Sequence, residues 1–222
     1  MRTGVLGGTF NPIHYGHLRP ADELREALDL DQVRIVPLSL PAHKAPDDIA
    51  PAEDRLEMVH LALEEFPHFV CDPIEIERGG ISYTVDTLAE LSEGSCRGHD
   101  LFFIIGADAF SFLESWREPL RLLGMVNFAV TLRGEQDAGE VMTRVEEKLK
   151  GLDKRAHFKS VGENMFQYID SEKFINFTSV DTLNISATMI REWIRSRRSL
   201  RNLLPPSVEG IIIRRGLYGW EE

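Results

Sequence analysis

The sequence contains very little cysteine. Only Cys71 and Cys96 occur among 222 residues, and they form no Cys-x-x-Cys pair. Neither a disulfide framework nor a thiolate zinc site is therefore supported, and a reducing compartment is favoured. The chain also lacks any run of about 18 apolar residues and the charged-then-apolar plan of a signal peptide. We therefore expect a cytoplasmic protein that makes no contact with a membrane.

The sequence also lacks net positive charge. It has 25 Lys and Arg against 36 Asp and Glu, a formal net charge of −11. This balance argues against binding nucleic acid by charge alone. If the substrates are anionic, the cations that hold them must be concentrated locally. The candidate cations are His14, His17, His43 and Lys44, together with a C-terminal group comprising Arg191, Arg195, Arg197, Arg198 and Arg201. Most of that arginine group is expected to be a solvated helix face.

Two common phosphate-binding signatures are missing, the P-loop and the Gly-x-Gly-x-x-Gly dinucleotide fingerprint. In their place, residues 7–17 read Gly-Gly-Thr-Phe-Asn-Pro-Ile-His-Tyr-Gly-His between an apolar segment and an amphipathic one. This order predicts a strand, a tight loop and a helix whose unpaired N–H groups can hold phosphate. Gly7 and Gly8 have no Cβ to block a ligand. His14 and His17 are three residues apart and can point to one side.

Hydrophobic periodicity predicts alternating strands and helices along the chain. Strands are expected at 3–6, 33–38, 101–105 and 128–132, an extended segment at 69–76, and irregular β structure at 157–180. Helices are expected at 15–28, 53–65, 82–91, 108–116, 118–123, 137–152, 186–196 and 205–217. In the helix at 53–65, Leu56, Val59, His60 and Leu63 are expected to share one side.

This alternation is typical of an α/β fold with a Rossmann-like parallel sheet and helices on both faces. We expect one domain over residues 1–222, with a helical part from about 186 to 222 packed on it. Ligands bind beyond the carboxyl ends of strands in such sheets. Three polar segments fall there: the one that begins at Gly7, the Pro-Ala-His-Lys at 41–44, and Gly106-Ala-Asp at 106–108.

These motifs resemble the nucleotidyltransferases that carry a His-x-Gly-His motif, and among them the bacterial nicotinate-nucleotide adenylyltransferases. The matching pieces, in order along about 190 residues, are residues 7–17, 41–44, Arg55-Leu-Glu-Met58, Ser82-Tyr-Thr-Val-Asp-Thr-Leu88, residues 103–108 with Trp116, and Ile185-Ser-Ala-Thr-Met-Ile-Arg191. Two positions depart from the family pattern: Asn11 stands where many relatives have Asp, and Arg133 is followed by Gly-Glu rather than Pro-Gly.

The resemblance implies a nucleotidyltransferase fold and adenylyl transfer between ATP and nicotinate mononucleotide in NAD biosynthesis, with Mg²⁺ held through the phosphates rather than by a protein metal site. His14, His17 and Arg191 are then the expected catalytic residues. The expected ATP-binding residues are Gly7, Gly8, Thr9, Phe10, Gly106, Asp108, Ile185, Ser186 and Thr188. The alternative role for Ser186, Thr188 and Asp108 is purely structural, as helix caps.

The resemblance also implies a site for nicotinate mononucleotide, with Trp116 stacked on the ring. Its expected residues are His43, Lys44, Thr84, Phe112, Trp116 and Arg133. Ordinary core packing is the alternative for Trp116, and solvated surface is the alternative for Lys44.

Several functions compete with this interpretation. Related transferases acting on nicotinamide mononucleotide, phosphopantetheine or FMN, or a cytidylyltransferase, would share the first motif. A nucleotide sensor would bind ATP without turnover, and an RNA-binding module would use the arginines after residue 190. The retained histidines and Arg191 argue against a sensor, and the overall acidity argues against RNA. The oligomeric state cannot be read from this sequence.

Overall fold

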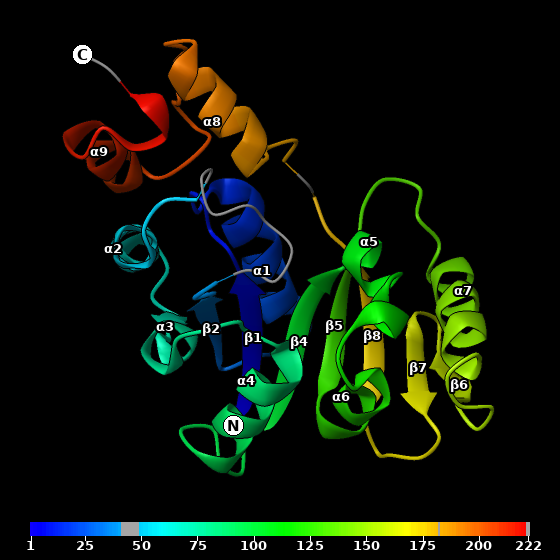
Figure 1. The fold of residues 1–222 in the computed structure, drawn as a ribbon. Coiled ribbons are helices and arrows are strands. Elements are labelled where there is room, and N and C mark those ends of the chain that lie inside the picture. The colour runs from blue at the N-terminus through cyan, green and yellow to red at the C-terminus, as the bar shows by residue number, and fades with distance from the viewer. Residues whose placement is uncertain (41–48, 182, 221–222) are drawn as a thin grey trace. The chain divides into compact units, whose positions relative to one another are not determined.

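The computed structural model describes residues 1–40, 49–181 and 183–220. Their backbone forms two compact units, each assembled from segments that are distant in sequence. The first unit contains residues 1–6, 23–32 and 83–181, and the second contains residues 7–22, 33–82 and the described C-terminal segment (Figure 1). The expectation of one domain over the whole chain stays a prediction.

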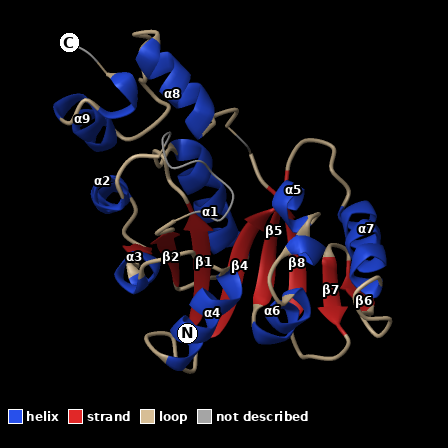
Figure 2. Cartoon of the chain, in the orientation of Figure 1, coloured by secondary structure: helices blue, strands red, loops and turns tan. Residues whose placement is uncertain are grey.

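The first unit is built around parallel strands. β1 (Arg2–Gly8, of which residues 2–6 belong here), β4 (Asp100–Gly106), β5 (Asn127–Leu132) and β8 (Phe174–Ser179) pair in that order (Figure 2). Every residue of β5 is buried. Such continuous burial, with Phe128, Ala129, Val130 and Leu132 as its apolar residues, is what a strand covered on both faces requires. The α/β class with a largely parallel sheet is confirmed.

Two further strands of the first unit run antiparallel, so the parallel sheet that we expected also contains an antiparallel part. β7 (Met165–Tyr168) pairs antiparallel with β8, and β6 (Phe158–Gly162) pairs antiparallel with β7. Only residues 163–164 connect β6 to β7, and so short a connection can join antiparallel strands only. The β structure predicted over 157–180 is confirmed, now with its strands defined.

The helices of the first unit pack on this sheet and on one another. They are α4 (Thr84–Glu93), α5 (Ala107–Phe110), the 3₁₀ turn η3 (Leu113–Ser115), α6 (Pro119–Met125) and α7 (Ala138–Lys150). α5 packs on β4 and β5, α6 on α4, and α7 on η3. The ring of Phe110 packs between those of Phe128 and Phe177 in this core.

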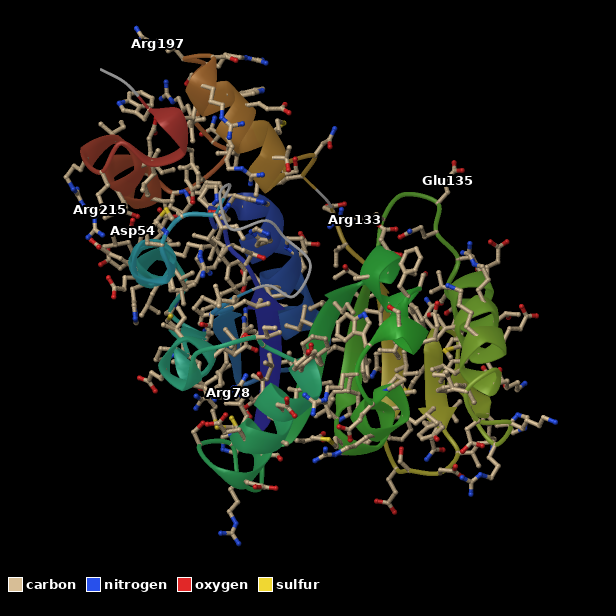
Figure 3. All side chains as sticks on the ribbon, in the orientation of Figure 1. Asp54, Arg78, Arg133, Glu135, Arg197 and Arg215 are labelled. Carbon is tan, nitrogen blue, oxygen red and sulfur yellow. The ribbon has the colours of Figure 1, made fainter. Side chains whose placement is uncertain are left out.

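The second unit contains a short parallel pair of strands and most of the remaining helices. Its elements are the start of α1 (Tyr15–Ala27), β2 (Gln32–Pro37), α2 (Ala52–Ala62), η2 (Leu63–Glu65), β3 (Phe69–Cys71), α3 (Ile74–Arg78), α8 (Ala187–Arg195), α9 (Pro206–Arg214) and η4 (Leu217–Gly219). α2 packs on α9. Arg215 forms ion pairs with Asp54 and Glu57 of α2. Arg215 and Asp54 are labelled in Figure 3.

Two local predictions for the second unit are partly wrong. Residues 69–71 are extended as expected, but residues 74–76 are helical, and Asp72 accepts a hydrogen bond from the Ile74 amide at the start of α3. Val59 and Leu63 are buried as expected, but His60 is exposed, and Arg55 and Met58 complete the buried side of α2. A charged residue thus occupies a core position, which hydrophobic periodicity alone does not identify.

Candidate functional site

The two histidines of the first motif lie together at the start of α1. Their rings stack with centroids 3.7 Å apart, and the His14 side chain is only 3% exposed. The ring of Phe10 meets His17 edge-on at 5.2 Å. The expected common side for His14 and His17 is therefore present, and buried aromatic packing holds both rings in place.

The glycines of this loop have different roles. A Cβ on Gly7 would meet nothing within 4 Å, so the open space expected for a ligand exists there. A Cβ on Gly8 would lie 2.8 Å from the ring of Phe10. Gly8 therefore makes room for Phe10, which itself adopts a positive φ of 46°. Close approach of a side chain, rather than of a ligand alone, requires this second glycine.

Gly16 joins the first motif to the second. A Cβ at this position would lie 2.9 Å from Nδ1 of His14 and 2.9 Å from the carbonyl oxygen of Ile185. Real Cβ atoms do not approach a backbone oxygen so closely, so only glycine fits between the two motifs. The segment that begins α8 is consequently brought against the histidines, although some 170 residues separate them in the sequence.

The start of α8 carries the second motif. Ser186 is the N-cap, and its hydroxyl accepts a hydrogen bond from the Met189 amide at 3.1 Å. The capping alternative for Ser186 is thus confirmed. Capping by Ser186 does not prevent the other N–H groups of this first turn from binding an anion. Both Ser186 and Thr188 are exposed.

Arg191 spans the two motifs. Its Nη1 donates to the carbonyl oxygen of Asn11 at 2.8 Å, and its Nη2 donates to Oγ1 of Thr188 at 3.4 Å. Asn11 in turn accepts a hydrogen bond on its side chain from the Ala50 amide at 2.9 Å. The amide side chain at position 11 therefore helps to order the loop.

Arg55 is a residue to which the sequence analysis gave no function. Its side chain is 1% exposed, and it donates to four carbonyl oxygens at 2.7–3.0 Å, those of Thr9, Leu38, Ser39 and Ala50. The signal that could have found it is an arginine placed three and four residues before Met58 and Val59 on the buried side of a helix.

Tyr218 is a second residue to which the sequence motifs gave no function. Burial raises the pKa of its phenol, and the charges of Arg191 and Arg55 oppose that rise. The pKa of Arg55 is lowered by burial, an effect that the Tyr218 phenol partly offsets. The C-terminal 3₁₀ turn therefore places a buried phenol near enough to both guanidinium groups for their charges to act on its pKa. No local pattern in residues 214–220 indicates this proximity.

The remaining predicted residues that the structure describes belong to the first unit. Gly106 is the N-cap of α5 and Asp108 lies in its first turn, so the capping alternative for Asp108 is wrong. The Asp108 carboxylate instead accepts a hydrogen bond from Nε2 of Gln136 at 3.0 Å, and it is exposed. It remains open to a ribose or another polar ligand from solvent.

The aromatic residues predicted for the acceptor are less buried than a core would demand. Phe112 is 60% exposed, and the ammonium of Lys148 lies 4.7 Å from its ring centroid. Trp116 is half-buried, with its ring 6.0 Å from that of Phe103 in an edge-to-face arrangement. Core packing therefore accounts for part of Trp116 and leaves part of it exposed.

Arg117 links Trp116 to the segment that contains Thr84. Its guanidinium lies 4.7 Å from the ring centroid of Tyr83 and 3.2 Å from the carboxylate of Asp86. Thr84 is the first residue of α4, between these two partners. The structure thus places Thr84 and the residue after Trp116 in one cluster, although more than 30 residues separate them in the sequence.

Three predicted residues carry less structural information. Arg133 is exposed on the loop between β5 and α7 (Figure 3). His43 and Lys44 lie outside the described residues. Among the described residues, no group of three or more His, Cys, Asp or Glu could hold a metal ion. Within the same residues, no helix is long and apolar enough to cross a bilayer.

Comparison with known proteins places this geometry in a family. The cytidylyltransferase-like family matches residues 5–193. A probable nicotinate-nucleotide adenylyltransferase of Desulfatibacillum aliphaticivorans is 39% identical over 98% of this chain and 100% of its own length. A protein of the same description from Halorhodospira halophila is 39% identical over 99% of this chain and 96% of its own.

Solved structures share the fold. The nicotinic acid mononucleotide adenylyltransferase of Plasmodium falciparum, complexed with NaAD, is similar with a TM-score of 0.74 and 16% identity. The alignment covers 99% of this chain and 98% of that one. A second structure of that enzyme, complexed with APC, gives a TM-score of 0.72. At this identity the likeness concerns the fold alone.

Proposed function

Because the chain belongs to the nicotinate-nucleotide adenylyltransferases within the cytidylyltransferase-like family, we propose that it joins ATP and nicotinate mononucleotide in NAD biosynthesis. The phosphate oxygen of the mononucleotide attacks the α-phosphorus of ATP. The bond from that phosphorus to the bridging oxygen breaks, and pyrophosphate leaves as nicotinate adenine dinucleotide forms. The attacking oxygen is already an anion, so no protein nucleophile is needed.

The observation that carries this proposal is the contact made possible by Gly16. It brings the His14 ring and the segment before α8 to one place, with Arg191 hydrogen-bonded to the loop between them. Positioning and neutralising charge are what adenylyl transfer requires of a protein. In the proposed site, His14, His17, Arg191 and the first turn of α8 bind the triphosphate, with Gly7, Gly8, Thr9 and Phe10 forming the loop.

Most residues of the proposed acceptor site belong to the first unit. Trp116 and Phe112 offer partly exposed rings, and Thr84 begins α4, next to Tyr83, over whose ring the guanidinium of Arg117 lies. The proposal assigns the nicotinate ring to Trp116. Asp108, with Gly106, is proposed for ATP, with its carboxylate on ribose hydroxyls of the nucleotide. Arg133, with His43 and Lys44, is proposed for the acceptor phosphate. Cations at these positions suit a mononucleotide in a chain whose net charge is −11.

A divalent ion, Mg²⁺, is part of the proposal and would enter with ATP. The donors gathered at the proposed phosphate site are imidazole, guanidinium and main-chain N–H groups. This set suits phosphate oxygens better than Mg²⁺, which prefers oxygen ligands and keeps several waters. The ion would therefore be held by phosphates and water, and would neutralise phosphate charge. The cytoplasm, where both substrates are available, is the proposed location.

A product assay tests the function. Purified protein is incubated with ATP, Mg²⁺ and either nicotinate mononucleotide, nicotinamide mononucleotide, FMN or phosphopantetheine, while pyrophosphate is measured and products are identified by mass. We expect release with nicotinate mononucleotide at a clear excess over the others. Comparable rates with the nicotinamide form would reject the acid preference, and ATP binding without pyrophosphate from any acceptor would indicate a sensor.

A further inference from the structure

We propose that Arg55 is a positioning residue of the phosphate-binding loop, acting through the main-chain carbonyl groups that it binds. The inference rests on the proposed function of the loop, and it adds a residue that the motif analysis did not assign. Arg55 touches no proposed ligand position directly. It acts through Thr9, which directly follows the glycine pair.

The guanidinium of Arg55 binds carbonyl groups from three segments of the chain. A guanidinium presents five donors in a rigid fork. In Arg55 that fork is divided among Thr9 after β1, Leu38 and Ser39 after β2, and Ala50 before α2. One buried side chain therefore ties together the exits of two parallel strands and the entrance of a helix. The conformation of the loop at Thr9 depends on segments up to 46 residues away.

The hydrogen bonds of Arg55 and Arg191 also change the electrostatics of the loop. A carbonyl oxygen carries partial negative charge, which opposes an approaching triphosphate. Two carbonyl oxygens of this loop are each bound by an arginine: Thr9 by Arg55 at 2.8 Å and Asn11 by Arg191 at 2.8 Å. The two arginines thus flank Phe10, and both neutralise groups that would repel the phosphates.

Arg55 carries a buried charge. Among residues 1–40, 49–181 and 183–220, no carboxylate forms an ion pair with Arg55, and its hydrogen-bond acceptors are neutral carbonyls. Burial lowers its pKa. Arginine is rarely buried without a paired group. Within the described residues, carbonyl dipoles compensate this cation, which leaves positive potential for an anionic ligand.

Two variants separate the charge from the fork. Arg55→Met removes the charge and every donor while keeping an unbranched stem, and Arg55→Lys keeps the charge without the fork. Arg34→Met is the matched control, because Arg34 is an arginine of the same unit whose guanidinium pairs with Asp72 at 2.6 Å. Its loss should lower stability without disturbing the loop.

The measurement is ATP affinity by titration calorimetry with Mg²⁺ and no acceptor, at a temperature where melting curves show each variant folded. We expect Arg55→Met to weaken ATP binding at least tenfold and Arg55→Lys to lie between it and the wild type. Arg34→Met should lower Tm and keep ATP affinity within twofold. Wild-type affinity in Arg55→Met, or an equal loss in Arg34→Met, would overturn the inference.

If Arg55→Met does not fold, Arg55→Lys decides the matter through steady-state kinetics. A raised KM for ATP with an unaltered KM for the acceptor supports the inference, and an unaltered KM for ATP overturns it. The test is separate from the proposed reaction. A wild-type protein that binds ATP but joins it to no acceptor would reject the proposed reaction, while the ATP affinities of the variants would still decide the role of Arg55.

Discussion

The two units hold residues of the proposed site in contrasting surroundings. In the second unit, His14 is almost fully buried, as is Arg55, which was not among the predicted site residues. The loop around Thr9 and Asn11 accepts hydrogen bonds from arginine donors. In the first unit, Phe112 is exposed and Trp116 is only half-buried. The proposed phosphate loop is therefore held by contacts within the protein, whereas the rings proposed for the acceptor offer surfaces that a ligand must cover.

The largest expected effect is on turnover and comes from a substitution at His17 in the second unit. His17→Ala should lower turnover by a factor on the order of 10² or more, because it removes a donor placed where charge builds on the phosphates. Circular dichroism and melting curves are expected to show an intact fold, and pyrophosphate release measures the rate. A variant that keeps the wild-type rate would remove His17 from the mechanism and weaken the contrast between the units.

The second prediction concerns Gly16. Gly16→Ala forces a Cβ against the Ile185 carbonyl, and overpacking of this kind costs about 1–3 kcal/mol. We expect a lower Tm together with a higher KM for ATP, because the two motifs are pushed apart. The matched control is Gly124→Ala, where a Cβ meets nothing within 4 Å on α6. An active, fully stable Gly16→Ala protein would show that the close contact is dispensable.

The third prediction concerns Trp116 in the first unit. Trp116→Ala should raise the KM for nicotinate mononucleotide about tenfold through the loss of ring stacking, worth roughly 0.5–1.5 kcal/mol, and of buried area. The KM for ATP should stay within twofold of the wild type. Trp116→Phe, which keeps an aromatic face, should recover part of the affinity. Equal effects on both substrates would mean that Trp116 supports the fold rather than the acceptor.

The smallest effect is expected at Arg133. Its side chain is exposed, and an exposed cation near a phosphate contributes about 1 kcal/mol or less. Arg133→Ala should therefore raise the acceptor KM only a few-fold, with the effect shrinking as salt is added. Arg121→Ala serves as the control, since Arg121 is an exposed arginine paired with Glu118. Identical behaviour of the two variants would exclude Arg133 from the site.

Much of this fold can be predicted from local patterns. β4 contains the apolar run 101–105, β5 is mostly apolar, and α7 and α8 begin at the side-chain caps Asp137 and Ser186. Such signals act over a few residues and can be read directly. The motif histidines could be placed for the same reason, since three-residue spacing on a helix fixes a common side.

The sequence alone could not reveal the contacts that cross the chain. The function of Arg55 depends on acceptors in three segments, and those acceptors are main-chain oxygens that leave no mark on residue type. The place of Tyr218 depends on a left-handed turn with φ of 61° near the C-terminus. Helix periodicity identified Val59 and Leu63 as buried but missed Arg55, because it assigns arginine to solvent regardless of its partners.

The central claim is that the loop from Gly7 to His17, with the first turn of α8, holds the triphosphate of ATP. A crystal structure with a non-hydrolysable ATP analogue and Mg²⁺ tests it most directly. We predict phosphate oxygens within hydrogen-bond distance of the His14 and His17 rings and of the α8 amides that follow Ser186. A triphosphate bound anywhere else, with these groups still in contact only with protein, would contradict the account.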